Sequence, residues 1–228
     1  MQALSKHERS TMEELASVKP EMDFRTSGFS LTSSYKELCP SGFKAIWLEV
    51  QEWHKETFFR CERDHGMINF LDIGSGLGGV CLLAAVVAGA NATGIELDSV
   101  LHKESVKWHE AGARQIPSLA RGLLDQSKRL ICANVLDGGC IPLIQNADVI
   151  FINNVLFNDV IHGTSLNTEI LNLLIKHMGR SACCVTTHPM GSTHPGRSVQ
   201  VIKKFEMPSY SVSWTNKPVS AYITRRSD

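Results

Sequence analysis

This 228-residue sequence lacks several features that mark common protein classes. Its longest apolar run, Val80 to Ala90, is far shorter than the ~20 residues of a membrane-spanning helix, and the polar residues after Met1 contain no signal-peptide core. The seven cysteines form no C-x-x-C pair, and the nine histidines form no H-E-x-x-H motif. We therefore expect an intracellular protein with reduced thiols, no membrane partner and no bound metal.

Net charge is also missing, because 23 basic side chains balance 23 acidic ones. With 43% hydrophobic residues, the composition favours a packed core over disorder. The charges are uneven along the chain, since residues 180–228 carry seven basic and two acidic side chains, a net charge of +5. This segment could contact DNA or another acidic partner, although an ordinary solvated surface explains such an excess equally well.

Strand-like and helix-like segments alternate through most of the chain. Residues 1–34 read as a polar arm, 35–66 as a lid segment with an amphipathic helix at 40–60, and 67–228 as the core. Within the core we expect strands at 67–72, 92–96, 129–133, 148–153 and 181–187, helices at 77–88, 99–126 and 164–178, and strand-like runs at 198–205, 210–214 and 219–224. The order predicts an α/β, Rossmann-like fold, with a mainly parallel sheet closed by a C-terminal antiparallel hairpin.

A glycine-rich turn follows the first expected strand. Gly74, Gly76 and Gly79 would let a ligand approach the backbone, with the first amides of the next helix facing it. Glu96 ends the second strand, where a carboxylate can accept both hydroxyls of an adenosine ribose. We expect an adenosine-containing ligand, and a turn that only packs strand against helix is the alternative.

Asp72, two residues before the first glycine, distinguishes two cofactors. A dinucleotide would bring two phosphate charges against this carboxylate, which would repel them at short range. S-adenosyl-L-methionine has no phosphate, and its sulfonium and ammonium groups are cations that a carboxylate attracts. The pattern therefore favours S-adenosyl-L-methionine over NAD.

Two asparagines follow the third and fourth expected strands. Asn134 could bond the exocyclic amine of adenine while Val135 covers the ring, although an asparagine here is often only a turn residue. Asn153 lies at the carboxyl edge of the sheet, where ligands bind in open α/β folds. Its amide oxygen could hold an N–H of an attacking amine, and a plain strand cap is the alternative.

Four segments together resemble the disruptor of telomeric silencing family, the non-SET histone H3 lysine methyltransferases. They are Tyr35 to Leu38, Asp72 to Gly79, Val149 to Phe157 and Val212 to Tyr222, and the last is the most specific. The resemblance covers roughly residues 35–228. It implies a nuclear class I methyltransferase that uses S-adenosyl-L-methionine, releases S-adenosyl-L-homocysteine and methylates a lysine in the globular core of histone H3 within nucleosomes. A methyltransferase for small molecules or other proteins, and a non-catalytic chromatin module, are alternatives.

The resemblance also implies roles for individual residues. The cofactor site would consist of Tyr35, Glu37, Leu38, Asp72, Gly74, Ser75, Gly76, Gly79, Glu96, Asn134 and Val135. The methyl-transfer channel would be lined by Asn153, Phe157, Trp214, Ser220 and Tyr222. The family has a tyrosine where this chain has Ala221, so we expect a wider channel in this protein.

Overall fold

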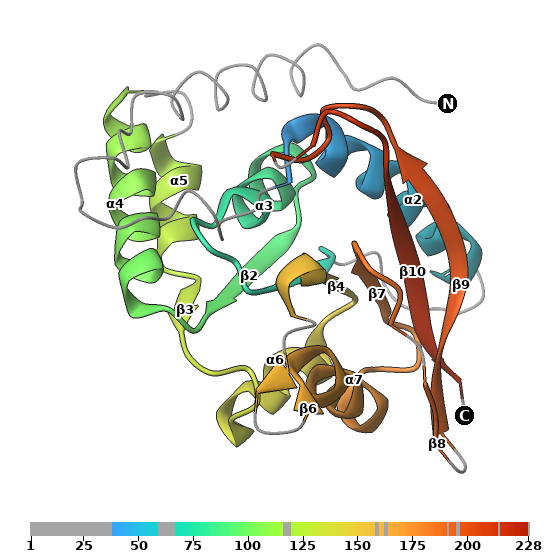
Figure 1. Ribbon diagram of the computed structural model, residues 1–228. Coiled ribbons are helices and arrows are strands. Elements are labelled where there is room, and N and C mark those ends of the chain that lie inside the picture. Colours follow the sequence, from blue (N-terminus) through green and yellow to red (C-terminus); the bar gives the residue numbers. More distant parts are fainter. Residues whose placement is uncertain are drawn as a thin grey trace.

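The computed structural model in Figure 1 forms one large sheet with helices on both faces. It describes residues 38–58, 67–115, 120–157, 160–161, 164–190, 192–194, 197–213 and 215–227. The polar arm expected at 1–34 lies outside the described residues, as do Tyr35, Glu37 and Trp214.

The sheet contains eight strands in the order β3-β2-β1-β4-β7-β10-β9-β8. In chain order the strands are β1 (Asn69–Ile73), β2 (Asn91–Glu96), β3 (Leu130–Cys132), β4 (Val149–Ile152), β7 (Cys183–Thr186), β8 (Ser192–His194), β9 (Arg197–Met207) and β10 (Val219–Ser227). The first five strands in the sheet are parallel, and β10, β9 and β8 each pair antiparallel with the strand before them. The expected parallel sheet with a closing hairpin is thus confirmed. A separate small ribbon joins β5 (Val160–Ile161) to β6 (Thr164–Ser165).

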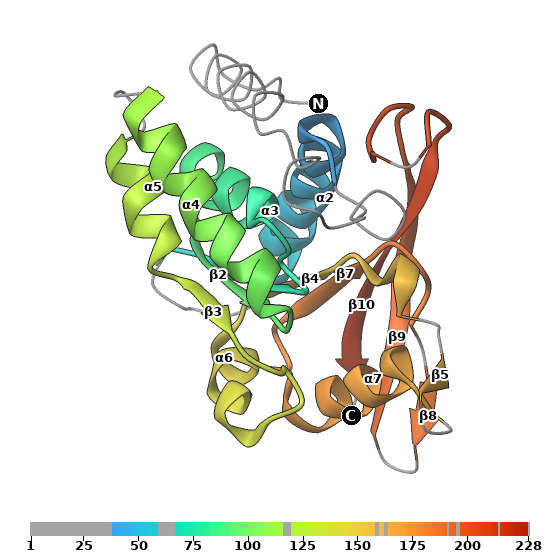
Figure 2. The ribbon, with the colours of Figure 1, turned by 60° about the vertical axis from the view of Figure 1, so that its left-hand side comes forward.

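Helices cover both faces of the sheet (Figure 2). They are α2 (Pro40–Phe58), α3 (Gly79–Leu82) continued by the π-helical η3 (Leu83–Val87), α4 (Ser99–Gln115), α5 (Ala120–Ser127), η5 (Gly138–Cys140), α6 (Ile141–Asn146), η6 (Asn154–Leu156) and α7 (Leu166–His177). Helices α2 to α5 lie on one side, and α6 and α7 lie on the other. The expected helices at 40–60, 77–88, 99–126 and 164–178 correspond to α2, α3 with η3, α4 with α5, and α7.

The α2-side core holds the first helices against the sheet. It contains buried side chains of α2, α3, η3 and one sheet face, among them Phe43, Trp47, Phe70, Phe151 and Ala221. Trp47 joins helix to sheet, because its ring centroid is 5.8 Å from that of Phe43 and 6.3 Å from that of Phe70. Burying each such ring removes apolar surface from water and stabilises the fold by about 1.5–3 kcal/mol.

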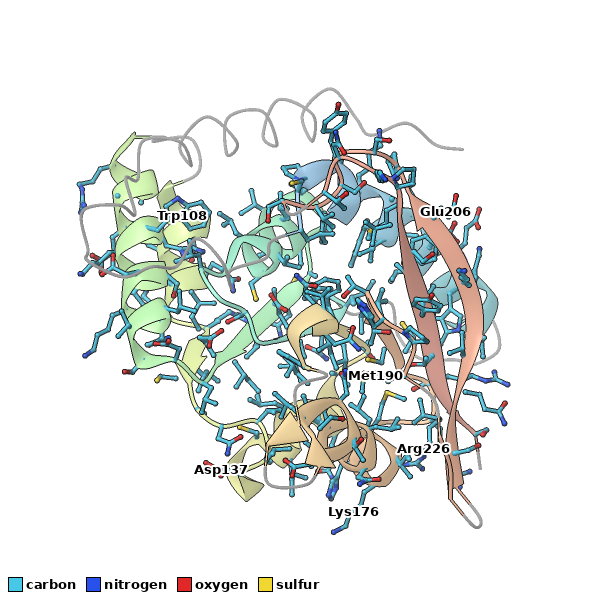
Figure 3. The ribbon with its side chains drawn as sticks, in the orientation of Figure 1. Trp108, Asp137, Lys176, Met190, Glu206 and Arg226 are labelled. Atoms are coloured by element: carbon cyan, nitrogen blue, oxygen red, sulfur yellow. The ribbon has the colours of Figure 1, made fainter. Side chains whose placement is uncertain are left out.

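The α7-side core fills the opposite face. It contains buried side chains of α6, α7 and the sheet, among them Leu71, Ile150, Ile152, Ile170 and Leu174, together with Met190, labelled in Figure 3. Alternate residues of β4 enter opposite cores, and all four of its residues are buried. This is why the strand reads as a continuous apolar run, as central parallel strands do.

The expected strand at 210–214 is wrong. Val212 makes only isolated bridges, with Leu38 and Thr215, and Tyr210 has a positive φ of 61°. The backbone N–H of Cys39 donates to Ser211 O at 2.8 Å, so the start of α2 takes up a carbonyl that a neighbouring strand would otherwise use. This tertiary contact overrides the local strand propensity.

The expected absences can be compared with the described part of the chain. There, no helix is long and apolar enough to cross a membrane, and no cluster of three or more His, Cys, Asp or Glu side chains could hold a metal ion. Six cysteines are free thiols, four of them buried, as in Cys81 and Cys183.

Candidate active site

A cavity of about 500 Å³ lies at the carboxyl ends of the central parallel strands. Strand β1 pairs with β2 on one side and β4 on the other, and a ligand binds at such a switch point in open α/β sheets. The volume is within the usual range of about 300–1,000 Å³ for small-molecule sites. The cavity is lined by Ile73, Gly74, Gly76, Ile95, Glu96, Leu97, Asp98, Leu101, Ala133, Asn134, Val135, Asn153, Val155, Phe157, Leu166 and Ile170.

The backbone N–H groups of the glycine-rich turn bond within the protein. Those of Gly74 and Ser75 donate to Ile95 O at 2.8 and 3.0 Å, and that of Gly78 donates to Ser75 O at 2.7 Å. The N–H of Gly76, which has a positive φ of 54°, donates to Glu96 Oε2 at 2.7 Å. These four donors are used within the protein, whereas the amides expected to face a ligand are the first ones of the next helix, α3, which begins at Gly79. A phosphate that approached the turn would therefore find the N–H groups of Gly74, Ser75, Gly76 and Gly78 already bonded.

Glu96 is nearly buried and takes part in the cavity wall. Its Oε1 accepts the N–H of Asp98 at 2.9 Å, so each carboxylate oxygen holds one backbone amide. A carboxylate can accept about four hydrogen bonds, which leaves capacity for two ribose hydroxyls. The two amides fix the rotamer of Glu96, so its remaining acceptor positions are set before a ligand binds.

The remaining cavity wall is mostly apolar. Leu97 is 66% exposed at the cavity although it is a large hydrophobic residue, whereas Val135 is buried below. A flat apolar ring bound here would cover Leu97 and remove its side chain from water. Asn134 Oδ1 accepts the N–H of Leu136 at 3.1 Å, which confirms a turn role for this side chain. Its expected contact with adenine stays a prediction.

Asp72 lies beneath the turn, outside the cavity lining, and is only 2% exposed. The Cys81 thiol donates to its Oδ2 at 3.7 Å. Burial raises the pKa of Asp72 to about 7, the thiol hydrogen bond lowers it, and the Glu96 charge adds to the rise. A nearby cation would favour the ionised form of this carboxyl, and an anion would oppose it.

Asn153 and Phe157 lie in the wall of the same cavity, on the chain that leaves β4. Asn153 Oδ1 accepts the hydroxyl of Thr187 at 3.0 Å. The ring of Phe157 packs over Gly74, where a Cβ would come within 3.1 Å of Phe157 Cζ. Two residues expected for methyl transfer thus line the same cavity as part of the expected cofactor site.

Two other expected channel residues, Ser220 and Tyr222, lie on β10, outside the cavity lining. Tyr222 is opposite Thr186 of β7, and Lys204 Nζ lies 5.9 Å from its ring centroid. Ser220 is opposite Glu206 of β9. Ala221, between them, points to the opposite face and is fully buried in the α2-side core. Its small side chain therefore fills a core position and opens no space in the described cavity.

The comparisons with known proteins agree with this geometry. Residues 60–226 match the family described as "Histone methylation protein DOT1". The chain belongs to this DOT1 family of histone methylation proteins. The expected family relationship is thus confirmed. A separate comparison with curated proteins found no match.

Solved structures resemble the DOT1-family chain in fold at low sequence identity. One is a mutant of MtNAS in complex with S-adenosylmethionine, with a TM-score of 0.50, 12% identity, and coverage of 97% of this chain and 74% of that one. Another is an RNA methyltransferase from Salinibacter ruber in complex with S-adenosyl-L-homocysteine, with a TM-score of 0.46, 16% identity, and coverage of 77% and 88%. A third is the rRNA methyltransferase aviRa from Streptomyces viridochromogenes, with a TM-score of 0.48, 12% identity, and coverage of 78% and 83%.

As a member of the DOT1 family, the chain is a class I methyltransferase that depends on S-adenosyl-L-methionine. The cavity is compatible with this cofactor, because it combines a fixed carboxylate that can accept ribose hydroxyls with an apolar wall that a flat ring can cover.

Of the expected site residues, the cavity brings together seven: Gly74, Gly76, Glu96, Asn134, Val135, Asn153 and Phe157. Leu38, Asp72, Ser75 and Gly79 lie outside its lining, with Ser75 buried under the turn and Gly79 at the start of α3. The sequence analysis did not identify Asp98, which also lines the cavity. An acidic residue at a helix start is a recognisable cap, and Asp98 Oδ1 accepts the N–H of Val100 at 2.7 Å. Thr187 was also missed, because nothing in its local sequence marks it.

Proposed function

We propose that this protein methylates the side-chain amine of a lysine in the globular core of histone H3 within nucleosomes, in the nucleus. Membership of the histone methylation family supports the proposal. The observation that carries it is the shared cavity, in which Asn153 and Phe157 lie beside the cofactor residues Gly74 and Glu96. An amide oxygen and an aromatic ring at this position suit a substrate amine better than an anionic group.

The proposed reaction is an in-line displacement. S-adenosyl-L-methionine supplies a methyl group activated by its positive sulfur. The lysine amine must be neutral to attack, yet an amine with pKa ~10.4 is uncharged in only about one molecule in a few thousand at neutral pH. The ring of Phe157 would exclude water from the amine, which disfavours the charged form.

In this mechanism the protein contributes mainly alignment. Asn153 Oδ1 would accept one N–H of the amine, so that the nitrogen lone pair points at the methyl carbon. Glu96, held by two backbone amides, would fix the other end of the cofactor through its ribose. Alignment of reactants in this way can lower the barrier by about 7–11 kcal/mol in favourable cases. Tyr35, Glu37 and Leu38 would lie at the cofactor, and Trp214, Ser220 and Tyr222 would lie near the lysine. Helix α2, within the expected lid at 35–66, is instead packed in the α2-side core.

We also propose a DNA contact through the basic C-terminal segment. Some of its basic side chains already have partners within the protein, because Lys203 pairs with Glu49 and with Glu52. Arg226, labelled in Figure 3, donates from Nη1 to Met178 O at 2.9 Å. Lys204, Lys217 and Arg225 are exposed. These three side chains could reach DNA phosphates beside the histone surface, and each such contact would add to the salt dependence of binding.

The test offers labelled S-adenosyl-L-methionine with intact nucleosomes, free histone H3 or an H3 tail peptide. We expect label on histone H3 in nucleosomes and little on the tail peptide. Label on another protein or a small molecule would replace the proposed substrate, and cofactor binding with no transfer to any acceptor would indicate a non-catalytic module.

A glycine variant tests the cofactor site separately. Gly76→Arg should abolish cofactor binding in calorimetry, because a side chain at this positive φ is strained and would enter the cavity. Gly138→Arg is the matched control, since a Cβ at Gly138 meets no atom within 4 Å. Normal binding by Gly76→Arg would remove the turn from the site.

A further inference from the structure

A buried hydrogen-bond network joins the end of β4 to the end of β7 behind Asn153. Its central member is Asn154, which is 0% exposed. Asn154 Oδ1 accepts the backbone N–H of His188 at 2.8 Å, and Asn154 Nδ2 donates to His188 O at 3.2 Å and to Asn167 Oδ1 at 3.0 Å. Because a backbone N–H can only donate, the orientation of this amide is determined.

Thr187 connects this network to the cavity. Its hydroxyl is 3.0 Å from Asn153 Oδ1 and 3.3 Å from Asn154 Oδ1, and the residue is buried. Asn154 Oδ1 can only accept, so the Thr187 hydroxyl donates toward the two amide oxygens. The position of Thr187 is set in turn by the adjacent His188, whose backbone N–H and C=O both bond the Asn154 side chain.

We propose that Thr187 is a positioning residue for methyl transfer, which orients the Asn153 amide oxygen, with Asn154 as the fixed support of both. The bond from Thr187 fixes the direction in which the Asn153 amide oxygen faces, and this direction decides how a substrate amine can approach it. This inference rests on the proposed function, in which Asn153 holds the attacking amine. It adds that the direction of the Asn153 amide oxygen is imposed by the residue that follows β7.

The test compares Thr187→Val, which keeps the shape and removes the hydroxyl, with Thr187→Ser, which keeps the hydroxyl. In the full chain with nucleosomes, Thr187→Val should lower kcat about tenfold, while the dissociation constant for S-adenosyl-L-methionine changes less than about twofold. Thr187→Ser should restore kcat to within about twofold of the wild type. Thr224→Val is the matched control, because it removes another buried hydroxyl, one that donates to Cys184 O at 3.1 Å.

A double-mutant cycle separates orientation of Asn153 from a general effect on folding. In an Asn153→Ala background, Thr187→Val should lower kcat no further, since the amide that it orients is gone. Additive effects of the two substitutions, or wild-type kcat in Thr187→Val, would overturn the proposal. Wild-type kcat in Asn153→Ala would overturn both the role of Asn153 and the inference.

A crystal structure of Thr187→Val keeps the inference testable if nucleosomes prove not to be the substrate. We expect the Asn153 amide to leave its wild-type orientation while the Asn154 hydrogen bonds to His188 remain. An Asn153 amide unmoved in the variant would refute the inference, and the absence of label on nucleosomes would refute only the proposed substrate.

Discussion

Asp72→Asn should change how the stability of this protein depends on pH. The Asp72 carboxyl is buried under the glycine-rich turn, where burial raises its pKa to about 7 from an ordinary value of 3.8. Between these two pH values the folded protein keeps a proton that the unfolded chain releases. Raising the pH therefore favours unfolding, and the stabilisation present below pH 3.8 is lost as the pH rises through 7.

The magnitude follows from the two pKa values. They differ by about 3, and each pH unit corresponds to about 1.36 kcal/mol, so the ionisation of Asp72 removes about 4 kcal/mol of folding free energy. Asparagine is nearly the same shape and does not ionise. The free energy of unfolding of Asp72→Asn minus that of the wild type should therefore be about 4 kcal/mol larger at pH 8.5 than at pH 4. Any effect of the substitution that does not depend on pH cancels in this comparison.

Urea unfolding followed by circular dichroism at several pH values measures this difference. Asp125→Asn on α5 is the matched control, because its carboxylate is exposed and stays in water on folding. If the wild type and Asp72→Asn lose stability in parallel between pH 4 and pH 8.5, Asp72 does not carry the buried proton.

Three further predictions concern the site and its surroundings. Glu96→Gln should weaken S-adenosyl-L-methionine binding about 10- to 100-fold in calorimetry, because a neutral amide replaces a carboxylate that accepts two backbone N–H groups. Unchanged affinity would exclude Glu96 from the ribose site. Ala221→Tyr should lower the Tm, since a ring at this fully buried position overpacks the α2-side core by about 1–3 kcal/mol or more, and an unchanged Tm would contradict the burial of Ala221. Lys204→Ala and Lys217→Ala should each reduce the salt dependence of nucleosome binding by about one phosphate contact. The measurement is the slope of log affinity against log salt concentration between about 50 and 200 mM, and a slope identical to that of the wild type would exclude these side chains from the DNA contact.

Patterns with a local physical cause were visible in the sequence. The parallel strands were predictable because residues such as Ile150 and Phe151 must be apolar when both faces of a strand are covered. The turn at Gly74 and Gly76 was predictable because positive φ angles require glycine there. An adenosine-containing ligand was predictable because Glu96 follows the glycine-rich turn at the end of the next strand, where a carboxylate can accept the ribose hydroxyls.

Other features arise only when distant segments meet. Asp72 was expected at the cofactor, yet it lies below the turn, because alternation along β1 turns its side chain toward Cys81 on α3. Ala221 was expected to widen a channel, yet alternation along β10 places it in the α2-side core. The residues around 210–213 look like a strand, yet Tyr210 has a positive φ and Ser211 O accepts the N–H of Cys39.

The sequence by itself determined the fold class, the cofactor and the family of this protein, because these depend on residue types at short, fixed spacings. The tertiary structure alone decided which side chains surround Asn153. Thr187 is 34 positions away from Asn153 along the chain, and it becomes a neighbour because β4 and β7 end side by side in the sheet. A hydrogen bond between the ends of two strands depends on their register, and no local pattern records that register.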